Sequence, residues 1–329
     1  MKRAVGMLLA VAAGLGGAVA EAQPGPTRAD QIRAHKIEAR RIAGADFTGA
    51  LARLCTVPDT MMPRAAPAGG PAIPDRASWY AEPYKVFDDL YWVGTKVHSA
   101  WALTTRDGII LIDTVYNYAA ETAIVGGLKK LGLDPASVKY VVISHGHGDH
   151  DEGARLFQER YGAHVVMSAE DWELVAGQTG MPGGQPKRDV VAKDGDRVTL
   201  GGAEVRLVQT PGHTLGTLSM VFTVHDKGRP IAVAYSGGTA FNFPPSKVRF
   251  DSYIASQRRL ARAAAEAGAT VLLSNHSEFD RAYDLARVSQ LPRAPGEPSP
   301  FVIGADAVGR YFAVTAACAE SAKLETGVP

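Results

Sequence analysis

Three histidines and a carboxylate occupy six consecutive positions, from His145 to His150, and this segment constrains the fold more than any other. The apolar residues 140–143 precede it and form a run short enough for a strand that is buried on both faces. A helix is expected over residues 152–161. The cluster therefore lies in a loop that joins a buried strand to a helix, so strands and helices must alternate in this part of the fold.

The spacing of these residues is typical of a metal site. Residues two apart in an extended loop point the same way, so His145 and His147 can present ring nitrogens to one ion. The glycines between them let the backbone bend closely around that ion. Asp149 and His150 then face a neighbouring point, which makes a second ion possible.

Two further histidines follow strand candidates, and each lies in a turn-like segment. His213 lies within residues 210–216 and His276 follows residues 271–273. Both are candidate ligands, because each can lie at the same sheet edge as the cluster. The other histidines outside the cluster are interpreted as ordinary core or surface residues: His35, His98, His164 and His225.

The rest of the chain alternates short strands with helices. Strands are expected at residues 84–87, 90–93, 100–105, 109–112, 197–200, 204–208, 218–224, 231–235 and 271–273. Helices are expected at residues 118–131, 253–267 and 304–324, and a loop at residues 177–187. This pattern predicts two sheets stacked face to face with helices outside.

The first 22 residues have the features of a secretory signal peptide. Two basic residues (Lys2, Arg3) precede an apolar run that contains several glycines, and Ala20-Glu21-Ala22 fits a cleavage site. An uncleaved membrane anchor is the alternative, although the run is short for a span. Residues 23–78 then form an extension with a helix at 29–41 and a Pro-rich linker, ahead of one domain at residues 79–329. The expected location is periplasmic or secreted.

The charge balance indicates which class of partner to expect. The 35 Lys and Arg residues nearly balance the 34 Asp and Glu residues, and no long run of either sign occurs, so neither nucleic acid nor an anionic membrane is an expected partner. The expected partner is a small molecule.

Cys55 and Cys318 can pair in an oxidising compartment and so tie the extension to the C-terminal helix. The alternative is that they are two small buried residues. The oligomeric state does not follow from the sequence.

The order His-x-His-x-Asp-His, later Gly-His and a final His after a strand resembles the metallo-β-lactamase fold superfamily over residues 79–329. The resemblance implies an α/β fold of the αββα sandwich type with two Zn²⁺ ions at one sheet edge. It implies that the ligands are His145, His147 and His213 for the first zinc, and Asp149, His150 and His276 for the second. Three protein ligands per ion leave positions open for water, as catalytic zinc requires.

Residues 235–241 distinguish members of this superfamily. Glyoxalase-like hydrolases, lactone hydrolases and phosphodiesterases place a metal-bridging Asp here, whereas this chain has Gly238 and Thr239. The absence of a cysteine ligand makes the site similar to the third subclass (B3) of zinc β-lactamases. Thr239 is a candidate substrate contact through its hydroxyl. Trp101 is a candidate apolar contact, with ordinary sheet packing as the alternative.

The resemblance implies an exported zinc hydrolase that opens the β-lactam ring of antibiotics by attack of a zinc-bound hydroxide. Asp149 would bind the second zinc and orient the nucleophile, which makes it the catalytic residue. The alternative is a hydrolase of the same fold that acts on a different ester, amide or phosphate. A protein that merely stores zinc is a third possibility, which the open coordination positions disfavour.

Overall fold

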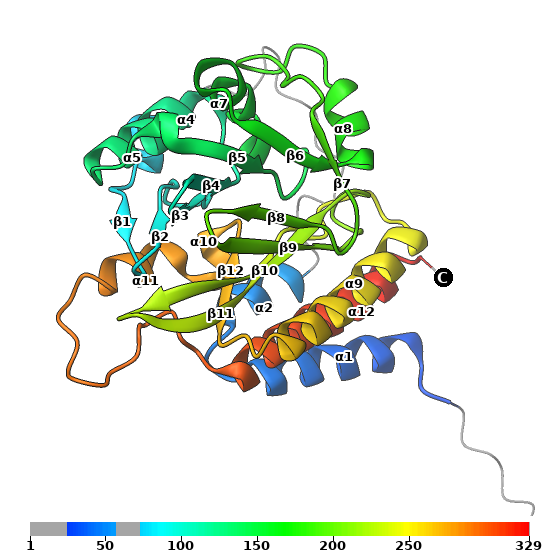
Figure 1. Cartoon of the computed structure of the whole chain (residues 1–329). Coiled ribbons are helices and arrows are strands. Elements are labelled where there is room, and N and C mark those ends of the chain that lie inside the picture. The colour runs from blue at the N-terminus through cyan, green and yellow to red at the C-terminus, as the bar shows by residue number, and fades with distance from the viewer. Residues whose placement is uncertain (1–24, 57–72, 329) are drawn as a thin grey trace, which may run out of the picture.

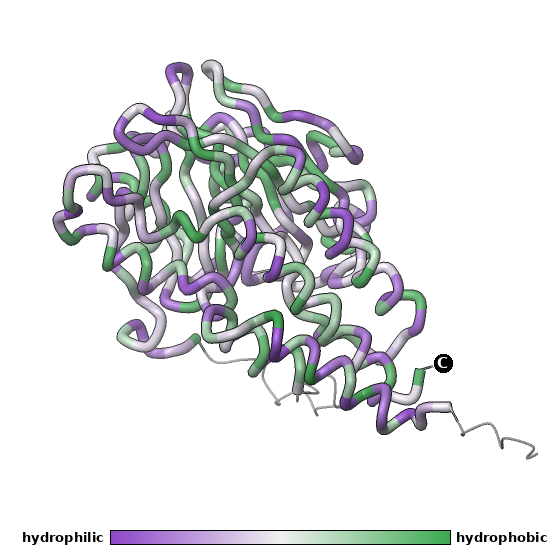
Figure 2. Tube along the Cα trace, turned by 90° about the horizontal axis from the view of Figure 1, so that it is seen from below, coloured by the Kyte–Doolittle hydropathy of each residue, from purple (hydrophilic) through white to green (hydrophobic). Residues whose placement is uncertain are grey.

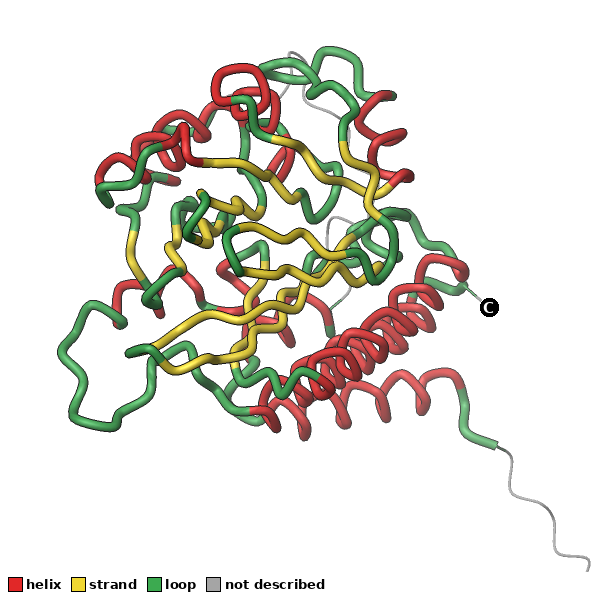
Figure 3. The backbone as a smooth tube through the Cα atoms, in the orientation of Figure 1, coloured by secondary structure: helices red, strands yellow, loops and turns green. Residues whose placement is uncertain are grey.

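The structure is a computed structural model that describes residues 25–56 and 73–328. Two β-sheets lie face to face, and helices cover both outer faces (Figure 1). The αββα sandwich expected from the sequence is confirmed. Figure 3 shows the same layering, with helices on the two outer sides and strands between them.

The first sheet has seven strands in the order of the chain. The pairs from β1 to β4 are antiparallel, and those from β4 to β7 are parallel. Its strands are β1 (Tyr84–Lys85), β2 (Leu90–Trp92), β3 (Trp101–Thr105), β4 (Gly108–Ile112), β5 (Val138–Val142), β6 (His164–Ser168) and β7 (Val190–Ala192).

The second sheet has five strands in the order β12-β11-β10-β9-β8. Its pairs are antiparallel except for β11 and β12, which run parallel. Its strands are β8 (Arg197–Leu200), β9 (Ala203–Gln209), β10 (Leu218–Asp226), β11 (Arg229–Ser236) and β12 (Val271–Ser274).

The helices form two outer layers (Figure 1). The first sheet is covered by α4 (Asn117–Ala120), α5 (Gly126–Lys130), α7 (Ala154–Tyr161) and α8 (Ala169–Ala176), with a π-helical turn (Glu121–Val125) joining α4 to α5. The second sheet is covered by α9 (Lys247–Glu266) and α12 (Ala305–Glu325), and α1 (Arg28–Ala43) and α2 (Thr48–Leu54) pack against α12. Shorter helices are α3 (Arg76–Trp79), α6 (Gly148–Asp151), α10 (Ser277–Asp280) and α11 (Ala282–Val288), and a 3₁₀ turn spans Pro135–Ser137.

Apolar side chains fill the space between the sheets and beneath both helical layers. The layer between the sheets includes Trp92, Leu103, Met220 and Leu273, all of them fully or almost fully buried. Figure 2 shows hydrophobic residues concentrated toward the middle of the molecule and hydrophilic residues along its outer turns. Burial of this area is the main favourable contribution to folding.

Strand direction determines where functional side chains can meet. The strands β4 and β5 are parallel, and so are β11 and β12, while β9 runs in the same direction as β11 because both pair antiparallel with β10. The carboxyl ends of strands that run in one direction lie at the same edge of their sheet. The loops after these five strands therefore project at the sheet edges where a site can form.

The N-terminal extension packs on the domain rather than standing apart from it. The expected helix at residues 29–41 is α1, and it lies along α12. A disulfide joins Cys55 to Cys318, which confirms the pairing hypothesis. Residues 1–22 and most of the linker lie outside the described residues, so the signal peptide stays a prediction. Within the described part of the chain, no helix is long and apolar enough to cross a membrane.

Some elements were not expected from the sequence. These are β6, β7, α2, α3, α6, α8, α10 and α11. Their segments are short, and β7 is largely exposed, so no clear hydrophobic period marks it. Tertiary pairing with β6 keeps β7 in the sheet.

Replacing Cys55 and Cys318 together by serine should lower the free energy of unfolding by about 2–5 kcal/mol, because a native disulfide restricts the unfolded chain. The two residues are 263 positions apart. Chemical unfolding of the oxidised protein, the reduced protein and the double variant measures the effect. The last two should unfold at the same, lower denaturant concentration, whereas equal stability of all three would contradict a stabilising role.

Candidate metal centre

Four loops form the candidate site at one edge of the sandwich, and three of them carry the candidate ligands. The loop after β5 carries His145, His147 and, within α6, Asp149 and His150, while the loops after β9 and β12 carry the remaining two histidines. The fourth loop, after β11, contributes backbone carbonyls. All six residues expected to bind metal are thus brought together.

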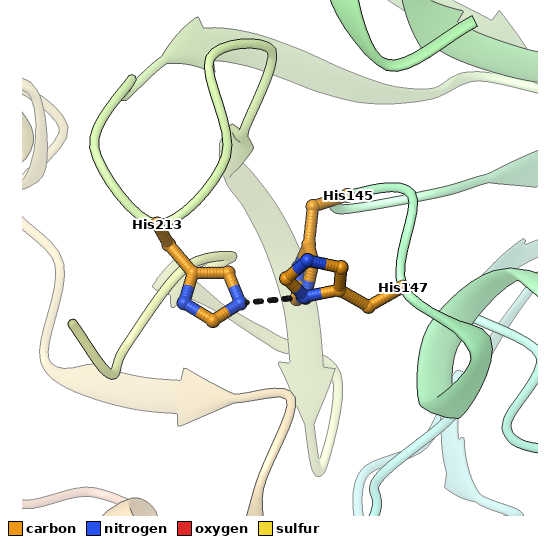
Figure 4. A group of neighbouring side chains, drawn as sticks. All are labelled: His145, His147 and His213. Atoms are coloured by element: carbon orange, nitrogen blue, oxygen red, sulfur yellow. Dashed lines mark hydrogen bonds between the residues drawn. The ribbon is translucent and has the colours of Figure 1, made fainter. Parts of the chain in front are cut away.

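The first donor set consists of three histidines whose rings point toward one another (Figure 4). The Nε2 atom of His213 lies 2.9 Å from Nε2 of His145 and 3.1 Å from Nδ1 of His147. Two ligands of a tetrahedral ion with bonds of about 2.0–2.1 Å are separated by about 3.3–3.4 Å. The spacing of the three nitrogens is therefore close to that of ligands around one zinc ion.

The protonation states of the ring nitrogens of His145 and His213 explain why a cation fits between them. The Nδ1 atoms of His145 and His213 lie 2.8 Å and 2.6 Å from the carbonyl oxygens of Gly237 and Ala240, which only accept, so each Nδ1 carries the proton. Burial holds the pKa of both rings well below the usual value, so both are neutral. Their Nε2 lone pairs then face each other across 2.9 Å. Neither nitrogen can then donate to the other, so a shared cation stabilises the pair.

The second donor set combines a carboxylate with two imidazoles. The Nε2 atoms of His150 and His276 are 3.2 Å apart, and they lie 3.2 Å and 3.3 Å from Oδ2 of Asp149. Asp149 also lies within 4.8 Å of the donor atom of His145, so the two sets are adjacent. A carboxylate with imidazole nitrogens suits zinc and similar transition metals.

The charge of the second set favours a cation as well. Burial opposes a charged ring at His150, but the carboxylates of Asp149 and Asp113 outweigh it and raise the pKa of this histidine to about 10. Burial likewise opposes ionisation of Asp149, but the neighbouring His150 holds the pKa of this carboxyl well below its usual value. The two carboxylates stabilise positive charge at this position, which a divalent metal ion can supply in place of the proton.

The buried carboxylate of Asp113 supports the second set from behind. Asp113 directly follows β4, adopts a left-handed backbone (φ 60°) and is fully buried. It accepts hydrogen bonds from the backbone N–H and hydroxyl of Ser144 at 2.7 Å and 2.9 Å, and from the hydroxyl of Tyr235 at 2.6 Å. Its Oδ2 lies 3.3 Å from Nδ1 of His150. This contact orients the ring so that Nε2 faces the site.

A second buried carboxylate joins two ligand loops. Asp171, at the start of α8, accepts from the backbone N–H groups of Gly146 at 3.0 Å and Gly216 at 3.2 Å, and from the Thr214 hydroxyl at 2.9 Å. The first of these partners lies between His145 and His147, and the others follow His213. Burial raises the pKa of Asp171 to about 6. This side chain therefore holds the loops of the first donor set in register.

The donors open into a cavity of about 740 Å³. The described residues that line it are Ala52, Arg53, Thr56, Tyr116, His145, His147, Gly148, Asp149, His213, Thr239, Ala240, Asn242, Asn275, His276, Glu278 and Phe279. The first three come from the N-terminal extension. The extension is therefore part of the cavity wall, which the sequence did not indicate.

The two expected substrate contacts need correction. Trp101 is fully buried between the sheets, where it packs edge-on against Phe301 at 5.9 Å, so it cannot contact a substrate, and the sheet-packing alternative holds. Thr239 lines the cavity but is only 2% exposed. Its hydroxyl is engaged with Ser274 at 2.7 Å and Asn275 at 3.3 Å, which leaves it poorly placed to recognise a substrate.

A histidine of the site was missed. His98, interpreted from the sequence as an ordinary histidine, lies beside the second donor set, with Nε2 3.7 Å from Oδ2 of Asp149. Burial lowers the pKa of His98 to about 3, so the ring is neutral and able to bind metal. The residues next to His98 in the sequence include no second candidate ligand, so no local pattern marked it.

Packing closes position 238, where the resemblance implies a bridging carboxylate in other hydrolases of this fold. A Cβ atom at Gly238 would lie 2.6 Å from Cγ2 of Thr217 and 2.8 Å from Cβ of His213. Any side chain here would push against a ligand of the first donor set. The glycine therefore fits this packing, and the centre is built without a carboxylate at position 238.

The comparisons with known proteins agree with this geometry. Residues 93–276, more than half of the chain, match the family model described as the Metallo-beta-lactamase superfamily, so the protein belongs to that superfamily. BJP-1, a subclass B3 metallo-β-lactamase of Bradyrhizobium japonicum, is 26% identical, with 70% of this chain and 89% of that chain covered and a TM-score of 0.60. A metallo-β-lactamase of Cronobacter sakazakii is also 26% identical, with 76% and 94% covered and a TM-score of 0.60.

The curated proteins that are similar in sequence bear a different name from the solved structures. A hydroxyacylglutathione hydrolase of Chelativorans sp. is 26% identical over 141 residues, which are 43% of this chain and 48% of that relative. The chain spans half or less of the length of this and the next most similar curated relatives. The family is thus established, and membership of it supports an enzyme of the metallohydrolase type.

Replacing Asp113 by Asn should weaken metal binding at the second donor set by about 10–100-fold, because loss of an outer partner leaves a ligand imidazole poorly oriented. Competition with a chromophoric chelator measures the affinity. Tyr235→Phe is the control, since it removes one hydrogen bond to Asp113 but keeps the carboxylate, and its effect should be smaller. If Asp113→Asn folds normally and binds metal as the wild type does, the supporting role is wrong.

Proposed function

We propose that the protein is an exported zinc hydrolase that holds two zinc ions and opens the β-lactam ring. The observation that carries the proposal is the pair of adjacent donor sets, one of three neutral imidazoles and one of a carboxylate with two imidazoles, with no carboxylate at position 238. Export is supported by the signal-like N-terminus and by the disulfide, which is typical of an oxidising compartment.

The missing carboxylate favours a β-lactam over the substrates of the other relatives. A bridging Asp adds a negative charge between two metal ions, as the resemblance implies for glyoxalase-like hydrolases and phosphodiesterases. A centre that lacks it keeps more positive charge, which stabilises the anionic nitrogen released when the lactam C–N bond breaks. Gly238 therefore supports β-lactam hydrolysis, although the curated relatives bear another name.

The chemistry divides between the metal and the side chains. Bound zinc would supply Lewis acidity, which lowers the pKa of a water and polarises the lactam carbonyl. His145, His147 and His213 would hold the first ion. Asp149 belongs to the second donor set, is adjacent to the first and is only 17% exposed, so its carboxylate can accept a hydrogen bond from the attacking water and orient it.

A cation on the cavity wall supplies a partner for the carboxylate that β-lactam drugs carry. Arg53 of α2 lines the cavity and pairs with Glu278 of α10. A guanidinium has five N–H donors, so this pair leaves donors free. The disulfide at Cys55, two residues further on, fixes the end of α2. Arg53 therefore replaces Thr239 as our candidate for substrate recognition.

A substrate panel tests the function. The purified protein should hydrolyse a chromogenic cephalosporin, lose this activity to a chelator and regain it with zinc. It should be nearly inert toward bis-nitrophenyl phosphate and a hydroxyacylglutathione thioester, because no bridging carboxylate is available. Efficient thioester or phosphodiester hydrolysis, with no cephalosporin turnover at full zinc occupancy, would contradict the proposal and favour the alternative hydrolase.

Arg53→Ala should raise the KM for a carboxylate-bearing β-lactam by roughly 10–100-fold, as loss of a charge-assisted hydrogen bond of about 1.5–3 kcal/mol implies. Because the guanidinium is distant from the bond that breaks, kcat should change less. Steady-state kinetics separates the two constants. Arg33→Ala, on α1 of the same extension, is the matched control and should leave both unchanged. An unaltered KM in Arg53→Ala would remove this role.

A further inference from the structure

His98 belongs to a tight turn that fixes its position. The backbone N–H of His98 donates to the hydroxyl of Thr95 at 2.9 Å, and the backbone N–H of Thr95 donates to the carbonyl of His98 at 2.7 Å. The same hydroxyl lies 3.5 Å from Nδ1 of the His98 ring. The turn follows β2, so the histidine is attached to the first sheet.

The loop after β12 binds this turn from the other side. His98 and His276 form an isolated antiparallel bridge. The flanking residues extend it, because the N–H of Ser99 donates to the carbonyl of Asn275 and the N–H of Ser277 donates to the carbonyl of Val97, each at 2.8 Å. The backbone of His98 is therefore held against a residue that we assign as a ligand of the second metal.

Ring contacts restrict the imidazole of His98 as well. It meets the rings of Tyr116 and His276 edge to face, each with centroids 5.1 Å apart. Its Nε2 lies 3.7 Å from Oδ2 of Asp149, and both side chains are 17% exposed. The donor atoms of His98, Asp149 and His276 all lie within 4.8 Å of one another.

The distances around Asp149 match the edges of one tetrahedron. Its Oδ2 is 3.2 Å from His150, 3.3 Å from His276 and 3.7 Å from His98, measured to Nε2 in each case. The first two nitrogens are 3.2 Å apart. Ligands of a tetrahedral zinc with bonds of about 2.0–2.1 Å are separated by about 3.3–3.4 Å. Three of these four distances agree closely. The Nε2 atom of His98 lies a few tenths of an ångström beyond the expected separation from Asp149, and a donor nitrogen of its ring lies within 4.8 Å of that of His276.

We propose that His98 is a fourth protein ligand of the second metal ion, together with Asp149, His150 and His276. The inference rests on the metal centre of the proposed function but not on its substrate. It makes the two sites unequal, because the first keeps three protein ligands and an open position, whereas the second is closed by four. The second ion is then held more firmly than three ligands would hold it, and substrate activation falls mainly to the first.

Cobalt in place of zinc tests the contact directly. With both cobalt ions bound, the ring protons of each ligand histidine should give strongly shifted proton NMR signals, because the paramagnetic ion acts on the imidazoles bonded to it. His98→Ala should lose one set of these signals, whereas His164→Ala, in which the replaced histidine lies on β6 and faces Asp189, should lose none. A folded His98→Ala protein that binds two cobalt ions and keeps every shifted signal would overturn the proposal.

Loss of the ligand gives a second readout. His98→Ala should lower the affinity for the second zinc equivalent by at least about 10–100-fold, since even outer partners of a metal ligand have effects of this size. His164→Ala should have no effect. Unchanged binding of the second equivalent by His98→Ala would overturn the proposal. Neither experiment uses a β-lactam. A protein that gives both expected results but does not hydrolyse β-lactams would therefore refute the proposed substrate and not the fourth ligand.

Discussion

The centre depends on two buried nitrogen lone pairs that face each other. His145 and His213 each direct a protonated Nδ1 at a backbone carbonyl, which leaves their Nε2 atoms 2.9 Å apart with no proton between them. A buried acceptor without a partner costs about 1–3 kcal/mol, and two facing acceptors also repel. The fold accepts this arrangement because a cation converts the repulsion into two bonds, so metal binding and local stability are coupled.

Both sheets and both buried carboxylates serve this geometry. Parallel strands bring the loops after β4, β5, β11 and β12 to the sheet edges, and the loop after β9 joins them. Asp113 orients His150, and Asp171 holds the backbone of the loops that carry His145 and His213. Each carboxylate is buried and is held by several hydrogen-bond donors, so it acts as a rigid support rather than as a solvated charge.

The six candidate ligands could be found from the sequence because loop spacing and strand ends determine where short side chains point. The core strands could also be predicted, because their apolar runs are distinct. Other features depend on contacts distant in sequence. His98 reaches the site only because its turn pairs with the loop of His276, and Arg53 only because α2 packs near α10. The burial of Trp101 depends on the opposing sheet, which the local pattern does not specify.

Anomalous X-ray diffraction from crystals grown with zinc, measured at the zinc absorption edge, tests the central claim most directly. Two peaks per chain are expected, separated by about 3.5–4 Å as in other two-metal sites. One peak should lie among His145, His147 and His213, and the other beside Asp149. A single peak at zinc saturation would contradict a two-metal centre, and no peak among the three histidines would contradict the assignment of their facing nitrogens to a shared cation.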